Sequence, residues 1–399
     1  MATRDALINK ETLAHICTSK QVSQNYLVSK GKFKVDRLAR WLDVTDTLLP
    51  TIKQAKTLAS CLHIPFAGLY MNPTDIPLKK IPSFRNMRTV LGASCNDDSA
   101  LNIAMIDLLN ERDFLLAANV ELGGYFPTFS IPTPMGDDPS HWATHIRKAF
   151  SIDMEKQYKA ASPRQFYLYL RNQIEAHGVF IQCFTDVPVE EARGIAIFDS
   201  GMPIIGINDE DRPPAKAFSI IHELVHILKR ESSLCNDIAN KQAVMQEEIF
   251  CNAVAGEFLV PENELSTLIN NKGFQKPYTI DDIAQIAKRF SVSREVIVRR
   301  LLELVYISEP EYQAYYVAFQ NELEEAREKQ RLARKKGLNI GPKRVVSREA
   351  FDRTSPSVCA TLYRGYSEDI YSKRDVAHHL NIDHKHIDKF LLEVAKWMK

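Results

Sequence analysis

The spacing of hydrophobic and polar residues predicts a chain that is helical at both ends and contains strands near its middle. From residue 10 to 72 the apolar residues recur at helical spacing in short runs, and a longer helical run covers 99–120. Two further helices are predicted near 141–150 and 163–177. Several short helices therefore precede the first predicted strand.

After these helices the spacing of apolar residues changes. Continuous or alternating apolar runs, which are typical of strands, replace the helical spacing. Three such runs cover 179–184, 194–198 and 203–208. The turn sequence Asp199-Ser200-Gly201 separates the last two runs, which favours a β-hairpin. We expect a small sheet that contains this hairpin.

Helical spacing returns at 218–228 and again at about 242–259. The first of these segments is apolar over most of its circumference, which is typical of a buried helix. Its remaining face is a narrow polar strip of Ser219, His222, Glu223 and His226. Because burial of unpaired polar groups is costly, this strip should face a cleft or a compensating partner.

The last third of the chain is also predicted to be helical. Two short helices over 279–290 and 295–304 resemble a helix-turn-helix, and we interpret them as packing elements. A charged helix is predicted over 311–336, with acidic residues first and basic residues last. This order suits the helix dipole and is typical of a solvated helix. The final apolar groups, up to Val394, predict further short helices.

Composition adds limits on the class of protein. The chain has 399 residues, 45% hydrophobic and 25% charged, with a formal net charge of +1 and seven irregularly spaced cysteines. These values favour a globular protein with reduced cysteines and no general attraction to nucleic acid or membrane. No signal peptide and no apolar run of about 20 residues is found. We expect a cytoplasmic protein with no membrane contact.

The polar strip contains the motif His-Glu-x-x-His at His222, Glu223 and His226. Histidines four apart are neighbours on a helix and can bind one zinc ion (Zn²⁺), while the glutamate between them serves as a general base. The alternative is two hydrogen-bonded core histidines. A catalytic zinc site needs a third protein ligand and keeps one position open.

The helix over 242–259 offers that third ligand. Glu248 lies on its apolar, small-residue face, where a buried acid needs a partner such as a metal ion. Glu247, on the flank of that face, is the alternative ligand, and Glu257 is expected on the more exposed side. The candidate metal ligands are therefore His222, His226 and one of two adjacent glutamates.

These motifs resemble the ImmA/IrrE family of zinc metallopeptidases. The resemblance rests on His222-Glu223-x-x-His226, on Glu248-x-x-Cys251-Asn252-x-Val254-Ala255 and on Leu259-Val260-Pro261. Family members usually have alanine at Cys251 and phenylalanine at Val254. The resemblance implies His222, His226 and Glu248 as zinc ligands and Glu223 as catalytic base. It also implies a zincin-like core, in which the motif helix lies beside a small sheet.

The N-terminal residues from Trp41 to Ala59 resemble the degenerate Xre-type helix-turn-helix of longer family members. DNA binding is one interpretation of this module, and a packing or protein-recognition role is the other. The possible phosphate contacts are Lys32, Lys34, Arg37, Arg40, Lys53 and Lys56.

The expected fold class is α+β and mostly helical, with a zincin-like core between helical N-terminal and C-terminal modules. The predicted domains are a helix-turn-helix-like module (1–75), a linker and helical segment (76–160), a zinc metallopeptidase core (161–308) and a C-terminal helical domain (309–399).

The resemblance implies an endopeptidase of narrow specificity whose substrate is a regulatory protein, either a repressor or an antitoxin, of a phage, mobile element or stress system. The alternative is a DNA-binding or toxin-binding regulator whose peptidase fold is weakly active or inactive.

Overall fold

The computed structural model describes residues 4–76, 79, 97–230, 241–336 and 345–398. Within these residues the protein is mostly helical, with one three-stranded sheet, which agrees with an α+β fold. Contacts divide the chain into two compact units. The first unit comprises the described residues of Met1–Phe114, Phe184–Ala192 and Leu234–Lys241. The second unit comprises the described residues of Leu115–Cys183, Arg193–Ser233 and Gln242–Lys399. The division into four domains stays a prediction.

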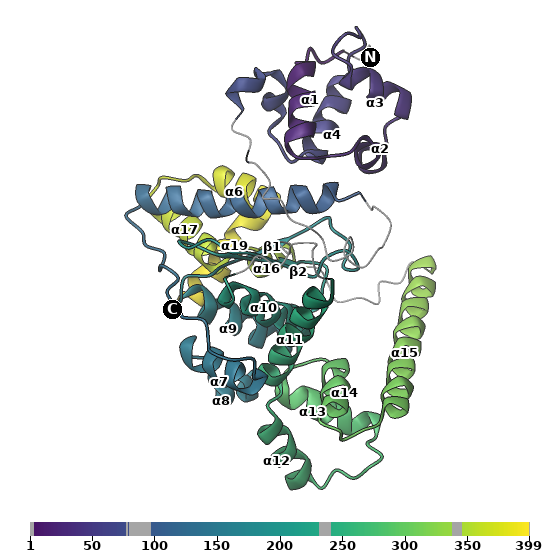
Figure 1. The fold of residues 1–399 in the computed structure, drawn as a ribbon. Helices are drawn as coiled ribbons and strands as arrows, with labels where there is room; N and C mark the ends of the chain where they lie inside the picture. Colours follow the sequence, from purple (N-terminus) through teal and green to yellow (C-terminus); the bar gives the residue numbers. More distant parts are fainter. Residues whose placement is uncertain (1–3, 77–78, 80–96, 231–240, 337–344, 399) are drawn as a thin grey trace. The chain divides into compact units, whose positions relative to one another are not determined.

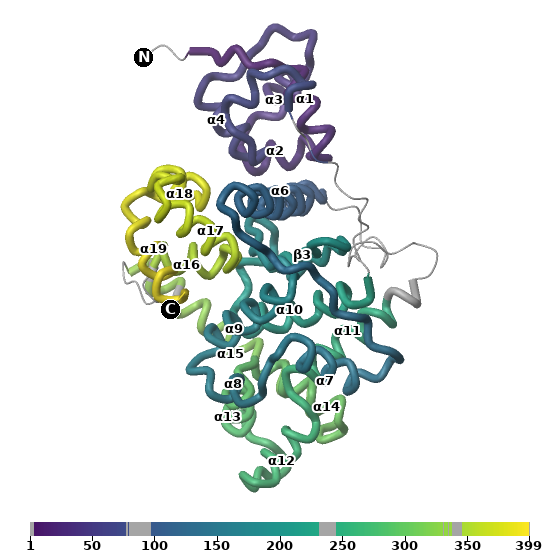
Figure 2. The backbone as a smooth tube through the Cα atoms, turned by 90° about the vertical axis from the view of Figure 1, so that its left-hand side faces the viewer, coloured from purple at the N-terminus to yellow at the C-terminus, as the bar shows by residue number. Residues whose placement is uncertain are grey.

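Short helices around a common core form the first unit (Figures 1 and 2). They are α1 (Lys10–Ser19), α2 (Gln24–Gly31), α3 (Val35–Leu42) and α4 (Ile52–Cys61), followed by the 3₁₀ turns η1 (Phe66–Tyr70) and η2 (Pro73–Asp75). Leu13, Leu27, Leu38, Trp41 and Leu58 are almost completely buried between them. Thr51 and Gln54 form a capping box that fixes the start of α4.

The basic residues of this unit that could contact phosphates lie at its surface. Lys32, Lys34, Arg37 and Arg40 are exposed, and Arg40 is paired with Asp46 at 2.7 Å. DNA binding by this unit stays a prediction.

The sheet contains β1 (Phe180–Phe184), β2 (Gly194–Ile197) and β3 (Ile204–Asn208) in the order β1-β3-β2. Strands β2 and β3 pair antiparallel, with Gly194 opposite Ile207 and Ile197 opposite Ile204. The predicted hairpin is therefore confirmed. Helix α10 (Pro213–Leu228) packs against both of these strands and against α9 (Pro163–Glu175) (Figure 1).

Helices account for most of the rest of the described chain. In order they are α6 (Ser99–Glu121), α7 (Pro139–Ala149), α8 (Met154–Lys159), α11 (Lys241–Leu259), α12 (Glu262–Lys272), α13 (Ile280–Phe290), α14 (Arg294–Glu303), α15 (Glu309–Lys335), α16 (Val346–Arg353), α17 (Pro356–Ser367), α18 (Lys373–His379), η3 (His384–His386) and α19 (Ile387–Trp397). Helices α8, α12 and α16 had no counterpart in the predicted pattern.

The C-terminal helices α16 to α19 pack on one another, as Figure 2 shows, and join the core of the second unit through buried polar contacts. The carboxylate of Glu175 on α9 accepts hydrogen bonds from the hydroxyls of Ser355 and Ser357, each at 2.7 Å. It also accepts the backbone N–H groups of Ile181 and Ser357 at 3.0 Å. Four donors thus satisfy one buried carboxylate.

Two observations concern the environment of the chain. Cys17, Cys61, Cys183, Cys251 and Cys359, the cysteines within the described residues, are all free and buried. Among those residues, none of the helices has the length and apolar character needed to cross a membrane.

Candidate metal centre

Helix α10 is held in the core by its apolar residues. Pro213 and Pro214 occupy its first turn, where a missing N–H costs least. Ile220, Leu224 and Val225 have no exposed surface and belong to one cluster with residues of the sheet and of α11. This packing fixes the direction in which the polar strip points.

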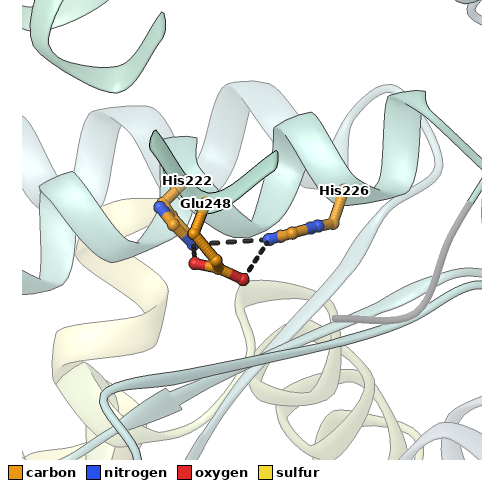
Figure 3. Close-up of side chains that lie close together, drawn as sticks. All are labelled: His222, His226 and Glu248. Carbon is orange, nitrogen blue, oxygen red and sulfur yellow. Dashed lines mark hydrogen bonds and ion pairs between the residues drawn. The ribbon is translucent and has the colours of Figure 1, made fainter. Parts of the chain in front are cut away.

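The structure brings His222, His226 and Glu248 together, as Figure 3 shows. The Nε2 atoms of the two histidines are 3.3 Å apart. Glu248 reaches over from α11, with Oε2 at 3.1 Å from Nε2 of His222 and Oε1 at 3.5 Å from Nε2 of His226. One carboxylate therefore contacts both imidazoles.

These separations fit a metal ion. A tetrahedral site with metal–ligand bonds of about 2.0–2.1 Å has ligands about 3.3 Å apart. The two Nε2 atoms, 3.3 Å apart, match that edge. The two oxygens of Glu248 each lie near one of these nitrogens, at 3.1 Å from His222 and 3.5 Å from His226. Two imidazole nitrogens and one carboxylate are also a donor set that catalytic zinc uses, with a fourth position left for water or substrate.

The charges at this centre influence one another strongly. Burial alone would raise the pKa of Glu248, but hydrogen bonds with His222 and His226 lower it to about 2. Burial alone would lower the pKa of His226, but its contacts with Cys251, Glu247 and Glu248 hold it well above its usual value. Without a metal the cluster thus favours a protonated His226 beside an ionised Glu248, and a cation at the same place would substitute for the proton.

The outer nitrogen of each histidine contacts an acceptor. Nδ1 of His222 is 3.1 Å from Oδ1 of Asn252, and Nδ1 of His226 is 3.3 Å from Oε1 of Glu247. An acceptor on Nδ1 places the proton there and leaves Nε2 free to bind a metal. Glu247 thus lies behind one imidazole, whereas Glu248 contacts the Nε2 atoms of both, so the geometry favours Glu248 as the third ligand.

Glu223 is buried, with 6% of its surface exposed, and lies against the first residue of β2. A Cβ atom on Gly194 would be only 2.5 Å from Oε1 of Glu223 and 2.7 Å from its Cγ. Gly194 therefore leaves the space that the Glu223 side chain occupies. The sequence predicts this strand as part of the hairpin but does not predict its contact with Glu223.

Other residues near the ligands have structural contacts. Glu257, expected on an exposed side of α11, instead forms an ion pair with the buried Arg300, so that expectation was wrong. The thiol of Cys251 is 3.9 Å from Nδ1 of His226, and burial raises its pKa.

A comparison with known families covers this part of the chain. Residues 174–302 match the family model described as the IrrE N-terminal-like domain, a peptidase family. This segment resembles an IrrE-type peptidase domain. It includes α10, α11, β2 and β3, with all three residues of the candidate metal centre and Glu223.

The match supports the family resemblance seen in the motifs and a metallopeptidase in general. The IrrE-like segment does not include residues 1–75, so their helix-turn-helix assignment stays a prediction. A search of curated proteins gave no match.

Two contributors to the site had no assigned role from sequence alone. Asn252 follows Glu248 by four residues, so helical spacing places both on one face of α11. That spacing is a signal that could have identified Asn252 as a partner of a ligand histidine. The contact between Gly194 and Glu223 joins a strand to a helix and has no local sequence signal.

Proposed function

We propose that this chain is a zinc-dependent endopeptidase of narrow specificity. The observation that supports it best is the convergence of His222, His226 and Glu248, whose contacting nitrogen and oxygen atoms lie 3.1 to 3.5 Å apart. In this proposal the three residues hold Zn²⁺ and Glu223 is the catalytic base. The core around them would be zincin-like, with α10 beside the small sheet.

Each side chain has a distinct role in this proposal. Asn252 and Glu247 would keep the two imidazoles in the tautomer that presents Nε2 to the ion. When bound, zinc acts as a Lewis acid that polarises the scissile carbonyl and makes water more acidic. Glu223, adjacent to His222, would accept the proton of the attacking water and deliver it to the leaving amine. Burial against Gly194 would hold its carboxylate in one position.

We infer a regulatory protein, a repressor or an antitoxin, as the substrate, from the resemblance to ImmA/IrrE peptidases. The cytoplasm is the compartment we propose, since the free cysteines of the described chain suit a reducing environment. A role of the first unit in binding DNA or a partner protein belongs to the same proposal.

The test compares the wild-type protein with Glu223→Gln, which removes the base and leaves the three ligands in place. Metal content is measured after purification, and new protein N-termini are mapped by mass spectrometry in cells that express each form. Glu262→Gln, a change of the same type at an exposed position on α12, is the control.

We expect about one zinc ion per chain in all three proteins. New N-termini should appear with the wild type and with Glu262→Gln, and should be absent with Glu223→Gln. Identical cleavage by Glu223→Gln would refute the proposed catalytic role. A cellular effect that survives in Glu223→Gln without any cleavage would favour the regulator instead.

A further inference from the structure

A second group of metal-binding side chains lies behind His226. Figure 3 shows Nδ1 of His226 on the side of the ring away from Glu248. On that side Nδ1 is 3.3 Å from Oε1 of Glu247 and 3.9 Å from the thiol of Cys251. One ligand atom of each of these three residues lies within 4.8 Å of the other two. An imidazole, a carboxylate and a thiol therefore meet at one place.

Two helices hold this group in position. Glu247 and Cys251 are four residues apart on α11, so their side chains are neighbours on one face of that helix. His226 comes from α10, whose apolar residues belong to the same core cluster as Cys251. Cys251 has no exposed surface, His226 is 1% exposed, and the side chain of Glu247 is 13% exposed. The three groups are thus kept together by packing, and an ion would reach them from the side of Glu247.

The separations suit an ion that binds both sulfur and nitrogen. With zinc–nitrogen and zinc–oxygen bonds of about 2.0–2.1 Å and a zinc–sulfur bond of about 2.3 Å, the ligand atoms of a tetrahedral site lie about 3.3 to 3.6 Å apart. The nitrogen–oxygen separation of 3.3 Å matches, and the nitrogen–sulfur separation of 3.9 Å is slightly longer. A thiolate beside an imidazole selects zinc and similar ions over magnesium and calcium.

The carboxylate of Glu247 can accept a cation at this place. Its recorded lysine contact is long, with Nζ of Lys229 at 4.0 Å from Oε1. Lys229 also lies over the ring of Phe250, 4.9 Å from its centroid. The side chain of Lys229 is 23% exposed, so it can turn towards solvent when an ion approaches the carboxylate. An ion bound by Glu247 would then compensate a largely buried negative charge.

We propose that Cys251, Glu247 and Nδ1 of His226 form a second binding position for a thiophilic divalent cation such as zinc, filled when the metal exceeds one ion per chain. The imidazole of His226 would bridge the two ions as an imidazolate. Binding would release the proton of the Cys251 thiol and the proton on Nδ1. This inference rests on the proposed function only in placing the first ion at Nε2 of His226.

Sharing one imidazole makes the two positions interdependent. Two cations on opposite nitrogens of a ring repel each other, and the second ion must also compete with Lys229 for Glu247. We expect the second ion to bind at least about tenfold more weakly than the first, so that purified protein keeps one ion per chain. Because such coupling is reciprocal, excess metal should also loosen the first ion.

The test uses Co²⁺ as the probe, because a cobalt–thiolate bond gives an intense near-ultraviolet charge-transfer band that imidazole and carboxylate ligands do not give. Metal-free full-length protein is titrated with Co²⁺ while its absorption spectrum is recorded. The first equivalent should produce only the weak visible bands of a site with nitrogen and oxygen ligands. The second equivalent should add the thiolate band.

Two variants remove the sulfur ligand, Cys251→Ala and Cys251→Ser, of which the second keeps the size of the side chain. Both should lose the second equivalent and its thiolate band. Cys359→Ala, the same change at another free and buried cysteine, is the control and should keep the band. Glu248→Gln weakens the first position and leaves the second set of ligands in place, so the thiolate band should persist.

The outcomes separate this inference from the proposed function. If one ion binds and no thiolate band appears at any Co²⁺ concentration, the second position is refuted and the peptidase proposal stands. A thiolate band that persists in both Cys251 variants refutes it equally. A band that appears with the first equivalent and is lost in both Cys251 variants would support the ligand set of Cys251 and contradict the zinc ligands of the proposed function.

Discussion

His226 makes contacts through both of its ring nitrogens, and this explains how the candidate site keeps its geometry. Nε2 lies near His222 and Glu248, while Nδ1 lies near Glu247 and the thiol of Cys251. The side chain is 1% exposed, so the ring has little freedom to rotate. His222 is less buried, and its contact with Asn252 is what limits the rotation of its ring.

Asn252 should therefore determine how well the site binds zinc. Asn252→Ala removes the acceptor for Nδ1 of His222, and we expect zinc affinity to fall about tenfold to hundredfold, as is typical for such outer contacts. Asn252→Asp keeps an acceptor of the same size and should retain affinity close to that of the wild type. Competition with a chromophoric chelator measures both constants. Equal affinities for Asn252→Ala and the wild type would show that the contact has no orienting role.

At the residue scale, the sequence predicted the groups that the structure brings together, but it left the choice between Glu247 and Glu248 open. Adjacent residues on a helix differ in direction by about 100°, and uncertainty in the pitch and bend of α11 is enough to exchange their positions. The structure separates them, since Glu248 contacts both histidines and Glu247 contacts only one.

At the element scale, the contact between β2 and α10 sets the position of Glu223. Gly194→Ala should push this side chain away, because the new Cβ would lie 2.5 Å from Oε1. We expect a large loss of peptidase activity with unchanged zinc content, since the three atoms nearest to the new Cβ all belong to Glu223 and not to a candidate ligand. Cleavage rate and metal content are measured on the same preparation.

Gly201→Ala is the matched control for that experiment. Gly201 lies in the turn between β2 and β3, where a Cβ would meet Asp199 at an ordinary 3.5 Å. Full activity of Gly201→Ala together with loss in Gly194→Ala would locate the effect at Glu223. Full activity in both variants would contradict the proposed packing of the base.

Elements with strong periodicity were predictable, and short ones were not. Helix α10, helix α11 and the β2–β3 hairpin each have a long apolar pattern or a turn signal, and each was found close to its predicted limits. Helix α8 has only six residues, too few for a 3.6-residue period to be recognised. Helix α10 begins at Pro213, although the sequence predicted a loop up to Pro214, because proline suits a first helical turn.

At the scale of the whole molecule, the C-terminal helices belong to the same compact unit as the candidate metal centre. Glu175 and Ser355 are 180 positions apart in the chain and form one buried hydrogen bond. Arg171 of α9 likewise donates to the backbone carbonyl of Asp352 at 2.6 Å. Such contacts join polar residues of ordinary appearance, so no local pattern in the sequence could predict them.

The stability of the whole protein should depend on pH through the cluster of His226 and Glu248. In the metal-free protein the pKa of His226 is raised, so its stabilising contribution is complete below the ordinary value of 6.5 and is lost as pH rises through the folded pKa. The pKa of Glu248 is lowered to about 2, so its contribution is complete above the ordinary value of 4.5 and is lost as pH falls towards that pKa. Both contributions are present together between 4.5 and 6.5.

Zinc should remove the loss on the alkaline side, because the ion takes the place of the proton and binds deprotonated ligands. We therefore expect the melting temperature of chelator-treated protein to be highest in that interval, whereas added zinc should raise it most at higher pH. Melting temperatures from about pH 4 to about pH 9, with chelator or with zinc, measure both curves. Glu248→Gln removes one of the three groups that raise the pKa of His226, after Cys251 and Glu247, and it also removes the titration of Glu248 itself, so its metal-free curve should be flatter. Parallel metal-free curves for the wild type and Glu248→Gln would mean that these two side chains do not interact in solution as their 3.5 Å separation requires.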